Sequence, residues 1–145
     1  MICIERIRDE HLPQIEMIEQ ECFSSPWTRK SLELLLGAGA VGFCATEQGK
    51  VVAYGGMMYV LDEGQITNIA TLSDYRRRGI AKKILESLSE FAKQNGLANI
   101  FLEVRQSNAG AIDLYRDFGF VQIGQRRNFY TDPAEDAILL KLDVK

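Results

Sequence analysis

The stretch Asp74-Tyr75-Arg76-Arg77-Arg78-Gly79-Ile80-Ala81 joins an apolar segment, residues 65–72, to a long amphipathic segment, residues 79–95. The apolar residues of the second segment follow helical spacing and form one stripe of Ile80, Ile84, Leu85, Leu88, Phe91 and Ala92. The first turn of a helix has free backbone N–H groups and the positive end of the helix dipole, and Gly79 lets that backbone approach a ligand. This order of strand, loop and helix predicts a site for an anion such as a pyrophosphate.

The glycines of this loop do not have the spacing of the common nucleotide motifs. They match neither Gly-x-x-x-x-Gly-Lys-Ser/Thr, which binds nucleoside triphosphates, nor Gly-x-Gly-x-x-Gly, which binds dinucleotides. The alternative is a surface run of three arginines before a helix, with no ligand at all. The loop alone therefore predicts an anion site without identifying the anion.

The rest of the chain alternates strand and helix patterns around this unit. The strand at residues 65–72 is irregular because Ile66, Ile69 and Leu72 lie three apart, so either both of its faces are covered or it contains a bulge. The order of elements predicts an α/β (α+β) fold with a mixed, mostly antiparallel sheet of about seven strands flanked by four helices, in one domain over residues 1–145. The other expected elements are strands at 2–7, 41–46, 51–59, 100–104, 120–124 and 137–142 and helices at 12–22, 28–36 and 108–118.

Composition narrows the class of protein. The chain has 145 residues, of which 46% are hydrophobic and 26% charged, as in an ordinary globular domain. Its formal net charge of −3 argues against a protein whose main role is to coat nucleic acid or an anionic membrane. Three cysteines without a Cys-x-x-Cys pair and a single histidine, His11, predict neither a disulfide framework nor a metal site. With no apolar run of membrane-spanning length and no recognisable signal peptide, a cytoplasmic protein is expected.

The loop residues Arg76-x-x-Gly79-x-Ala81 resemble the Arg/Gln-x-x-Gly-x-Gly/Ala signature of the GNAT superfamily, the Gcn5-related N-acetyltransferases. The chain as a whole is similar to this family, and more narrowly to the RimI-type enzymes that acetylate the N-terminal alanine of a small-subunit ribosomal protein. The resemblance implies the GNAT fold. It is carried over nearly the whole chain by the order and spacing of Pro26-Trp27-Thr28, Asn68-Ile69-Ala70, Leu102-Glu103-Val104-Arg105, Ser107-Asn108, Ala111, Leu114-Tyr115, Gly119-Phe120, Arg126-Arg127-Asn128-Phe129-Tyr130 and Glu135-Asp136-Ala137.

The resemblance also implies the cosubstrate and its contacts. In the family this loop binds the pyrophosphate of acetyl-coenzyme A, so acetyl-coenzyme A is the expected acetyl donor, with no metal ion. The residues at the matching positions are Ile69, Ala70, Thr71, Arg76, Arg77, Arg78, Gly79, Ile80, Ala81, Lys82 and Asn108. Taken alone, Asn108 has the position of a helix N-cap, and the two roles are compatible.

Glu103 is the candidate general base. Attack on a thioester needs a neutral amine, whereas a free α-amino group has a pKa of about 8, so a base assists at neutral pH. Glu103 lies in the apolar segment Ile100-Phe101-Leu102-Glu103-Val104, where burial would raise its pKa toward the working range. A glutamate that faces solvent from an edge strand is the alternative. In the family, the residue at the matching position is the catalytic base.

Tyr115 is the candidate general acid. The departing thiolate of coenzyme A needs a proton, and a phenol with a pKa of about 10 can supply it. Tyr115 follows Asn108 by about two helical turns, so both side chains project from one side of the helix. Packing beside Ile112 and Phe118 is the alternative role. In the family, the matching tyrosine is the general acid.

The carbonyl oxygen of the thioester needs an N–H donor as it becomes negative. The resemblance implies that the irregular strand around residues 69–71 supplies this donor, in which case the suspected bulge is functional. Cys22 or Cys44 could instead carry the acyl group, but no histidine lies near either residue in the sequence, and the family transfers the group directly to the amine. Both are expected to be core thiols.

The acceptor side is the least defined part of the predicted site. The rim and loop residues that could clamp an extended peptide are Trp27, Arg126, Asn128, Phe129 and Tyr130. Surface aromatic residues also often serve only in packing. The first hypothesis is a protein N-terminal acetyltransferase whose partner is a ribosomal protein, without nucleic acid or membrane. There are two alternatives: a GNAT enzyme for a small amine or a lysine side chain, and a noncatalytic acyl-coenzyme A binding module. The presence of both Glu103 and Tyr115 disfavours the noncatalytic module.

Overall fold

The computed structural model describes residues 1–144, which form a mixed seven-stranded sheet flanked by four helices. The strands are β1 (Ile2–Arg6), β2 (Ala40–Glu47), β3 (Lys50–Val60), β4 (Glu63–Thr71), β5 (Asn99–Arg105), β6 (Val121–Tyr130) and β7 (Glu135–Asp143). The helices are α1 (Leu12–Cys22), α2 (Arg29–Leu32), α3 (Ile80–Gln94) and α4 (Ala109–Phe118). The strand order is β1-β2-β3-β4-β5-β7-β6, and only the β4–β5 pair is parallel among these strands. The predicted fold class is confirmed.

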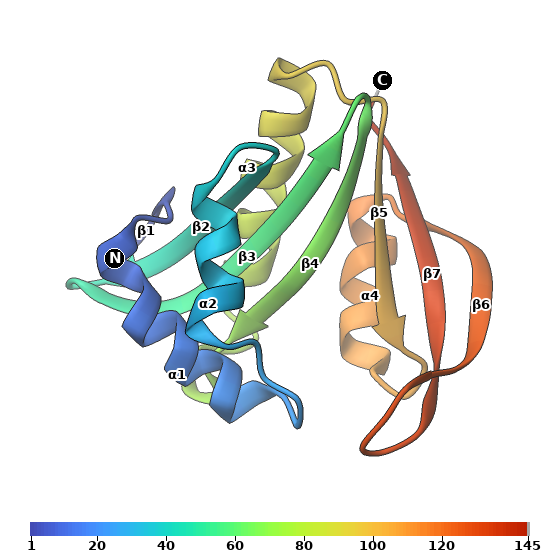
Figure 1. The fold of residues 1–145 in the computed structure, drawn as a ribbon, viewed down its shortest axis with the longest axis horizontal. Helices are drawn as coiled ribbons and strands as arrows, with labels where there is room; N and C mark the ends of the chain where they lie inside the picture. The colour runs from blue at the N-terminus through green and yellow to red at the C-terminus, as the bar shows by residue number, and fades with distance from the viewer. Residues whose placement is uncertain (145) are drawn as a thin grey trace.

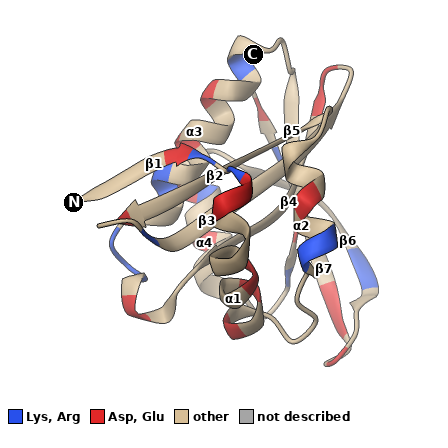
Figure 2. Ribbon diagram, turned by 60° about the vertical axis from the view of Figure 1, so that its left-hand side comes forward, with Lys and Arg blue, Asp and Glu red and all other residues tan. Residues whose placement is uncertain are grey.

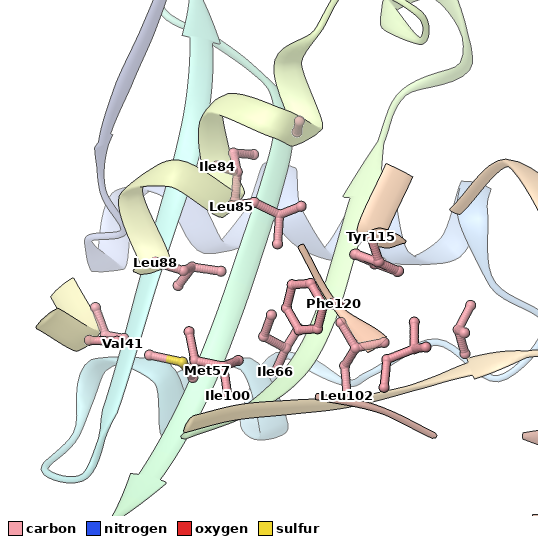
Figure 3. Close-up of a cluster of buried hydrophobic side chains, with 14 of the residues drawn as sticks. Val41, Met57, Ile66, Ile84, Leu85, Leu88, Ile100, Leu102, Tyr115 and Phe120 are labelled. Carbon is pink, nitrogen blue, oxygen red and sulfur yellow. The ribbon is translucent and has the colours of Figure 1, made fainter. Parts of the chain in front are cut away.

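The helices cover both faces of the sheet, with α1 and α2 on one face and α3 and α4 on the other (Figure 1). The α1–α2 face buries an apolar cluster that includes Leu12, Ile15, Ile18, Leu32, Leu35 and Tyr54. The opposite face buries the larger cluster, whose members in Figure 3 include Val41, Met57, Ile84, Leu85, Leu88 and Ile100. Burial of each large apolar side chain stabilises the fold by about 1.5–3 kcal/mol, which explains why the helical stripe of residues 80–92 faces the sheet.

A glycine in β3 sets how closely α3 packs on the sheet. A Cβ atom added at Gly55 would lie 2.5 Å from a side-chain carbon of Ile84, closer than two carbon atoms can approach. The absence of a side chain at Gly55 therefore lets α3 lie directly against β3. This contact helps to hold the N-terminus of α3 near the end of β4, where the predicted anion site lies.

The strands β4 and β5 pair over a short distance and then part. Their parallel register covers only Glu63–Gln65 of β4 and residues 99–101 of β5, after which the two strands diverge (Figure 1). Within β4, the pairing with β3 jumps between Ile66 and Asn68, which leaves Thr67 as the extra residue of a bulge. The irregular spacing is thus explained by a bulge at Thr67, within the strand expected at residues 65–72. The divergence opens the centre of the sheet.

Two predicted elements are corrected by the structure. The strand expected at 120–124 extends through Val121–Tyr130, because β6 continues to pair with β7 across two register shifts, so residues 126–130 lie in a strand and not in a loop. The helix expected at 28–36 is divided into α2 and a 3-10 turn at Glu33–Leu36. Among residues 1–144, no helix is both long and apolar enough to cross a membrane.

Candidate active site

A cleft of about 770 Å³ lies where β4 and β5 part. Its walls come from the segment between α1 and α2, from β4 and β5, from the start of α4 and from the turn between β6 and β7. The residues that line it include Glu19, Trp27, Thr67, Asn68, Ile69, Glu103, Arg105, Asn108, Tyr115, Phe129 and Tyr130. The cleft therefore brings together residues from both halves of the sequence.

Glu103 lines this cleft from β5. Side chains alternate along β5, so Glu103 faces the side of the sheet opposite to the buried Leu102 and Val104, which also border the cleft. At Glu103, β5 pairs with β7 through Leu139, whereas its pairing with β4 ends at Phe101, so the β4-facing edge of the strand is open here. The residue is half-buried, so the apolar enclosure expected from its neighbours in sequence is partial. The structure thus presents a carboxylate that a ligand in the cleft can reach.

Tyr115 approaches the same cleft from α4. It is 7% exposed and packs its ring edge-on against Phe120 at 5.7 Å between centroids, at the end of the main core (Figure 3). Burial, with a smaller contribution from Tyr130, raises the pKa of Tyr115 to about 12. The phenol therefore carries its proton at neutral pH. Asn108 also lines the cleft and caps α4, since its side chain accepts a hydrogen bond from the Ala111 N–H at 3.2 Å.

An arginine holds the wall formed by the β6–β7 turn. The guanidinium of Arg105 lies 4.5 Å from the centre of the Tyr130 ring, an attractive cation–π geometry. The same guanidinium donates to the carbonyl oxygens of Thr131 and Pro133 at 3.1 and 3.0 Å and pairs with Glu135 at 3.2 Å. Burial is the main cause that raises the pKa of Tyr130, and the negative charge of Glu103 adds to it. Tyr130 is thus fixed close to both the Glu103 carboxylate and the Tyr115 phenol.

The segment between α1 and α2 forms the facing wall. Ser24 Oγ donates to the carbonyl oxygen of Asp132 at 2.7 Å, which joins this segment to the β6–β7 turn. Figure 2 shows that the neighbouring elements differ in charge, since α1 carries acidic residues and β6 carries the basic pair Arg126 and Arg127. Of these charged residues only Glu19, which is buried, belongs to the lining of the cleft.

The predicted anion site lies at the start of α3. Both Arg77 and Gly79 adopt left-handed backbone, with φ of 63° and 75°, so successive N–H groups change direction just before the first helical turn. A Cβ atom added at Gly79 would meet no atom of residues 1–144 within 4 Å, so the space above the helix start is open. Free N–H groups, the helix dipole and this open space suit a pyrophosphate.

Arg76 is engaged with the protein itself. Its Nε donates to the Thr71 carbonyl oxygen at 3.1 Å, and its Nη2 lies 3.6 Å from the sulfur of Cys22. These contacts hold the end of β4 against α1. Burial raises the pKa of the Cys22 thiol and raises that of Cys44 to about 12, so neither is poised as a nucleophile.

The structure gathers part of the predicted site in the cleft. The predicted residues that line it are Ile69, Glu103, Asn108, Tyr115, Trp27, Phe129 and Tyr130. The remaining residues lie outside that lining, at the end of β4, in the loop and first turn of α3, and along exposed β6: they are Ala70, Thr71, Arg76, Arg77, Arg78, Gly79, Ile80, Ala81, Lys82, Arg126 and Asn128. The roles of both groups stay predictions.

Sequence reasoning did not identify Glu19. This residue has 0% exposure, yet its carboxylate accepts hydrogen bonds from the Trp27 N–H, the Tyr54 hydroxyl and the Asn68 amide. The partners lie as many as 49 positions away in the sequence, and helical spacing makes Glu19 look like an ordinary α1 residue. The one available signal was a glutamate on the apolar stripe of Leu12, Ile15 and Ile18.

In the part of the chain that the structure describes, no group of three or more His, Cys, Asp or Glu side chains could hold a metal ion. The groups that line the cleft include the Glu103 carboxylate and the Tyr115 phenol. Such a set suits proton transfer around an acyl group.

Comparison with known proteins agrees with this chemistry. The sequence profile of the acetyltransferase (GNAT) family matches residues 12–120, and the chain therefore belongs to this family. It is 38% identical to the ribosomal protein bS18-alanine N-acetyltransferase of Escherichia coli (strain K12), over 99% of both chains, and 36% identical to the enzyme of that name from Salmonella typhimurium, over 92% of this chain and 91% of the other.

Solved structures extend the comparison to the fold. The crystal structure of the ribosomal-protein-S18-alanine N-acetyltransferase from Escherichia coli superimposes with a TM-score of 0.93, covering 100% of this chain and 95% of that one at 38% identity. NAA60 of Arabidopsis thaliana in complex with acetyl-CoA gives a TM-score of 0.90 over 99% of both chains at 19% identity, which shows a shared fold. The resemblance to RimI-type GNAT enzymes is confirmed.

Proposed function

We propose that the protein transfers the acetyl group of acetyl-coenzyme A to the N-terminal α-amine of a ribosomal protein, with alanine as the first residue. The observation that supports this most directly is the cleft between β4 and β5, which holds the Glu103 carboxylate and the protonated Tyr115 phenol together. The acceptor is proposed from the relatives, whose names specify alanine of ribosomal protein bS18. Because the proposed acceptor is a ribosomal protein, we expect the reaction to take place in the cytoplasm.

Acetyl-coenzyme A is the proposed donor because the start of α3 has the features that a pyrophosphate needs. The left-handed backbone at Arg77 and Gly79 and the open space above Gly79 support this placement. When bound, the donor supplies an activated acetyl group as a thioester. The chain supplies the groups that bind it and move protons, and no metal ion is needed for this reaction.

The reaction proceeds by direct transfer. The acceptor amine gives a proton to Glu103, and the neutral nitrogen attacks the thioester carbon, so that a C–N bond forms and the carbonyl oxygen becomes negative. Beyond Gln65, β5 no longer pairs with β4, so N–H groups on that edge of β4 are available to the oxyanion. The C–S bond then breaks, and the Tyr115 hydroxyl gives its proton to the departing thiolate. The nitrogen loses its second proton as it becomes the amide nitrogen, and this proton restores the Tyr115 phenol.

An α-amine suits this site better than a lysine side chain. The pKa of an α-amine is about 8, whereas that of lysine is about 10.4, so a larger fraction of the α-amine is already neutral at pH 7. A carboxylate is a modest base, and it therefore assists the first acceptor far more than the second.

The test is a mass-shift assay with acetyl-coenzyme A and a matched panel of acceptors. The panel contains a peptide that begins with a free alanine, the same peptide blocked at its N-terminus but carrying internal lysines, and spermidine. We expect acetylation of the free-alanine peptide alone. Faster acetylation of the blocked peptide or of spermidine would contradict the proposed acceptor and favour a lysine or small-amine acetyltransferase.

A further inference from the structure

We propose that Glu19 is a positioning residue for the acceptor. Its buried carboxylate holds the wall that contains Trp27, between α1 and α2, against β4, and this wall is called the Trp27 wall below. The inference rests on the proposed function, since it assigns Glu19 a part in acceptor binding. Glu19 belongs to α1 and its side chain is fully buried, yet the residue forms part of the cleft lining. A buried carboxylate is costly unless its oxygens are satisfied, so its partners show what it does.

Three donors from different parts of the chain converge on this carboxylate. The Trp27 N–H donates to Oε1 at 2.7 Å, the Tyr54 hydroxyl donates to Oε2 at 2.5 Å, and Asn68 Nδ2 donates to Oε2 at 3.0 Å. Asn68 Nδ2 also lies 3.3 Å from the Tyr54 hydroxyl oxygen. Hydrogen bonds to an ionised group are shorter and stronger than those between neutral groups. One side chain thus links α1, the segment before α2, β3 and β4.

Two of these partners, Asn68 and Trp27, lie beside the proposed reacting centre and the proposed acceptor. Asn68 directly follows Thr67, the extra residue of the β4 bulge, and so borders the stretch of β4 that faces the proposed thioester. Trp27 packs partly against the α1–α2 cluster and also lines the cleft, on the proposed acceptor side. Its bond to Glu19 uses the backbone N–H and not the indole. The Glu19 carboxylate therefore fixes the distance between the Trp27 wall and the reacting centre.

Glu19 is not placed to act on the amine itself. Its two oxygens already accept three hydrogen bonds and its side chain has 0% exposure, whereas Glu103 in the same cleft is half-buried. Glu19 acts through Trp27 and Asn68, and Glu103 is the carboxylate that a substrate can reach.

The test compares Glu19→Gln with Tyr54→Phe. Glutamine keeps the size of the side chain but replaces one acceptor oxygen with a donor. Either the Trp27 N–H or both Tyr54 and Asn68 then lose their acceptor, and in both cases the link from Trp27 to β4 is broken. We expect the KM for an N-terminal alanine peptide to rise about tenfold, with the KM for acetyl-coenzyme A unchanged within about twofold. Tyr54→Phe is the matched control because it removes one donor from the same carboxylate, outside the cleft lining, and leaves the Trp27 bond in place. It should lower stability comparably and leave the peptide KM within about twofold of wild type.

Trp27 provides a second readout because it is the single tryptophan of the chain. Quenching of its fluorescence by acrylamide should increase in Glu19→Gln and stay at the wild-type level in Tyr54→Phe. Should Glu19→Gln fail to fold, hydrogen exchange in the wild-type protein decides the question. The Trp27 amide should then exchange at least about ten times more slowly than the amides of its exposed neighbours Ser24 and Ser25.

Several results would overturn the proposal. A fall in kcat of Glu19→Gln with an unchanged peptide KM would make Glu19 part of the chemistry. Equal rises in peptide KM in both variants would show that the effect follows stability, and an unprotected Trp27 amide would remove the bond on which the argument depends. If the wild-type protein did not acetylate the alanine peptide, the proposed function would fail instead, and the fluorescence and exchange measurements would still test the Trp27 wall.

Discussion

The two ends of the proposed site are built in different ways. The proposed donor end is a run of consecutive residues, 76–82, in which backbone N–H groups before and within the first turn of α3 supply the binding surface. The proposed acceptor end consists of side chains from distant segments, as in the Ser24–Asp132 bond, which spans 108 positions in the sequence. One end depends on local backbone conformation and the other on tertiary packing.

This difference predicts which substitutions should impair each end. A backbone site tolerates most changes of side chain but not a change at the residue that sets the conformation, here Gly79 with φ of 75°. A site made by packing is sensitive to each side chain that ties one wall to another. Glu103 and Tyr115 lie between the two ends, so their loss should affect the chemistry and neither binding step.

The largest effect is therefore expected at the centre of the cleft. Glu103→Gln and Tyr115→Phe should each lower kcat by a factor of about 10² to 10⁴, because a positioned acid or base contributes that much to rate. Both should leave the Kd for coenzyme A, measured by calorimetry, within about threefold of wild type. Wild-type turnover in both variants across the pH range would remove these residues from the proposed mechanism.

The next effect tests the backbone character of the donor end. Gly79→Trp should weaken coenzyme A binding at least tenfold, about 1.4 kcal/mol, because it fills the open space above α3 and forces a bulky residue into left-handed backbone. Gly79→Ala separates the two causes, since it adds the backbone strain without the bulk. Arg77→Ala should cost only a few-fold, because the phosphates are held mainly by N–H groups. Calorimetry showing undiminished affinity in Gly79→Trp would exclude this site.

A smaller effect is expected at the acceptor end. Tyr130→Ala should raise the peptide KM by roughly tenfold and leave that for acetyl-coenzyme A unchanged, since aromatic contacts of this kind contribute about 1–2 kcal/mol. Tyr130→Phe keeps the ring that lies over Arg105 and is the control for the hydroxyl. Steady-state kinetics with each substrate varied in turn provides the measurement. A rise in the acetyl-coenzyme A KM alone would place Tyr130 at the donor end instead.

The same contrast explains what the sequence could predict. The helix at 79–95 and the loop before it were predictable because apolar spacing and a glycine at a helix start are local signals. The mixed sheet with its four helices could be anticipated from the order of elements, and the bulge in β4 from the odd spacing of Ile66, Ile69 and Leu72. Its position at Thr67 depends on the pairing with β3, which the spacing does not reveal.

For the acceptor end, the sequence indicated candidate residues by their type but not the contacts that they make. Residues 126–130 were expected in a loop, whereas they belong to β6, which pairs with β7 at Arg126 and Tyr130 across a register shift. The bonds of Glu19 and Arg105 join elements whose proximity follows only from the completed sheet. No property of the isolated segments indicates such partners.

The smallest predicted effect is on the pH dependence of stability, to which Glu19 and Glu135 should contribute in opposite directions. Desolvation by burial is the main cause that raises the pKa of Glu19 above its usual 4.5, and the hydrogen bonds from Tyr54, Trp27 and Asn68 oppose it. The folded protein therefore binds this proton more tightly than the unfolded chain. Its contribution to stability is fully present below pH 4.5 and is lost as the pH rises through the raised pKa.

Glu135, which pairs with Arg105 beside the opposite wall, should behave in the reverse sense. Its hydrogen bonds with Ser107, helped by Arg105, lower the pKa of this carboxyl below 4.5, so its contribution is present above pH 4.5 and is lost as the pH falls through the lowered pKa. Urea denaturation of wild type, Glu19→Gln and Glu135→Gln between about pH 3 and about pH 8 measures both contributions to the free energy of unfolding. The free energy of unfolding of wild type relative to Glu19→Gln should fall as the pH rises, and that relative to Glu135→Gln should rise. Parallel slopes for the two differences would contradict the assignment, because a carboxylate desolvated within the core and one held by donors at the surface cannot respond to protons in the same direction.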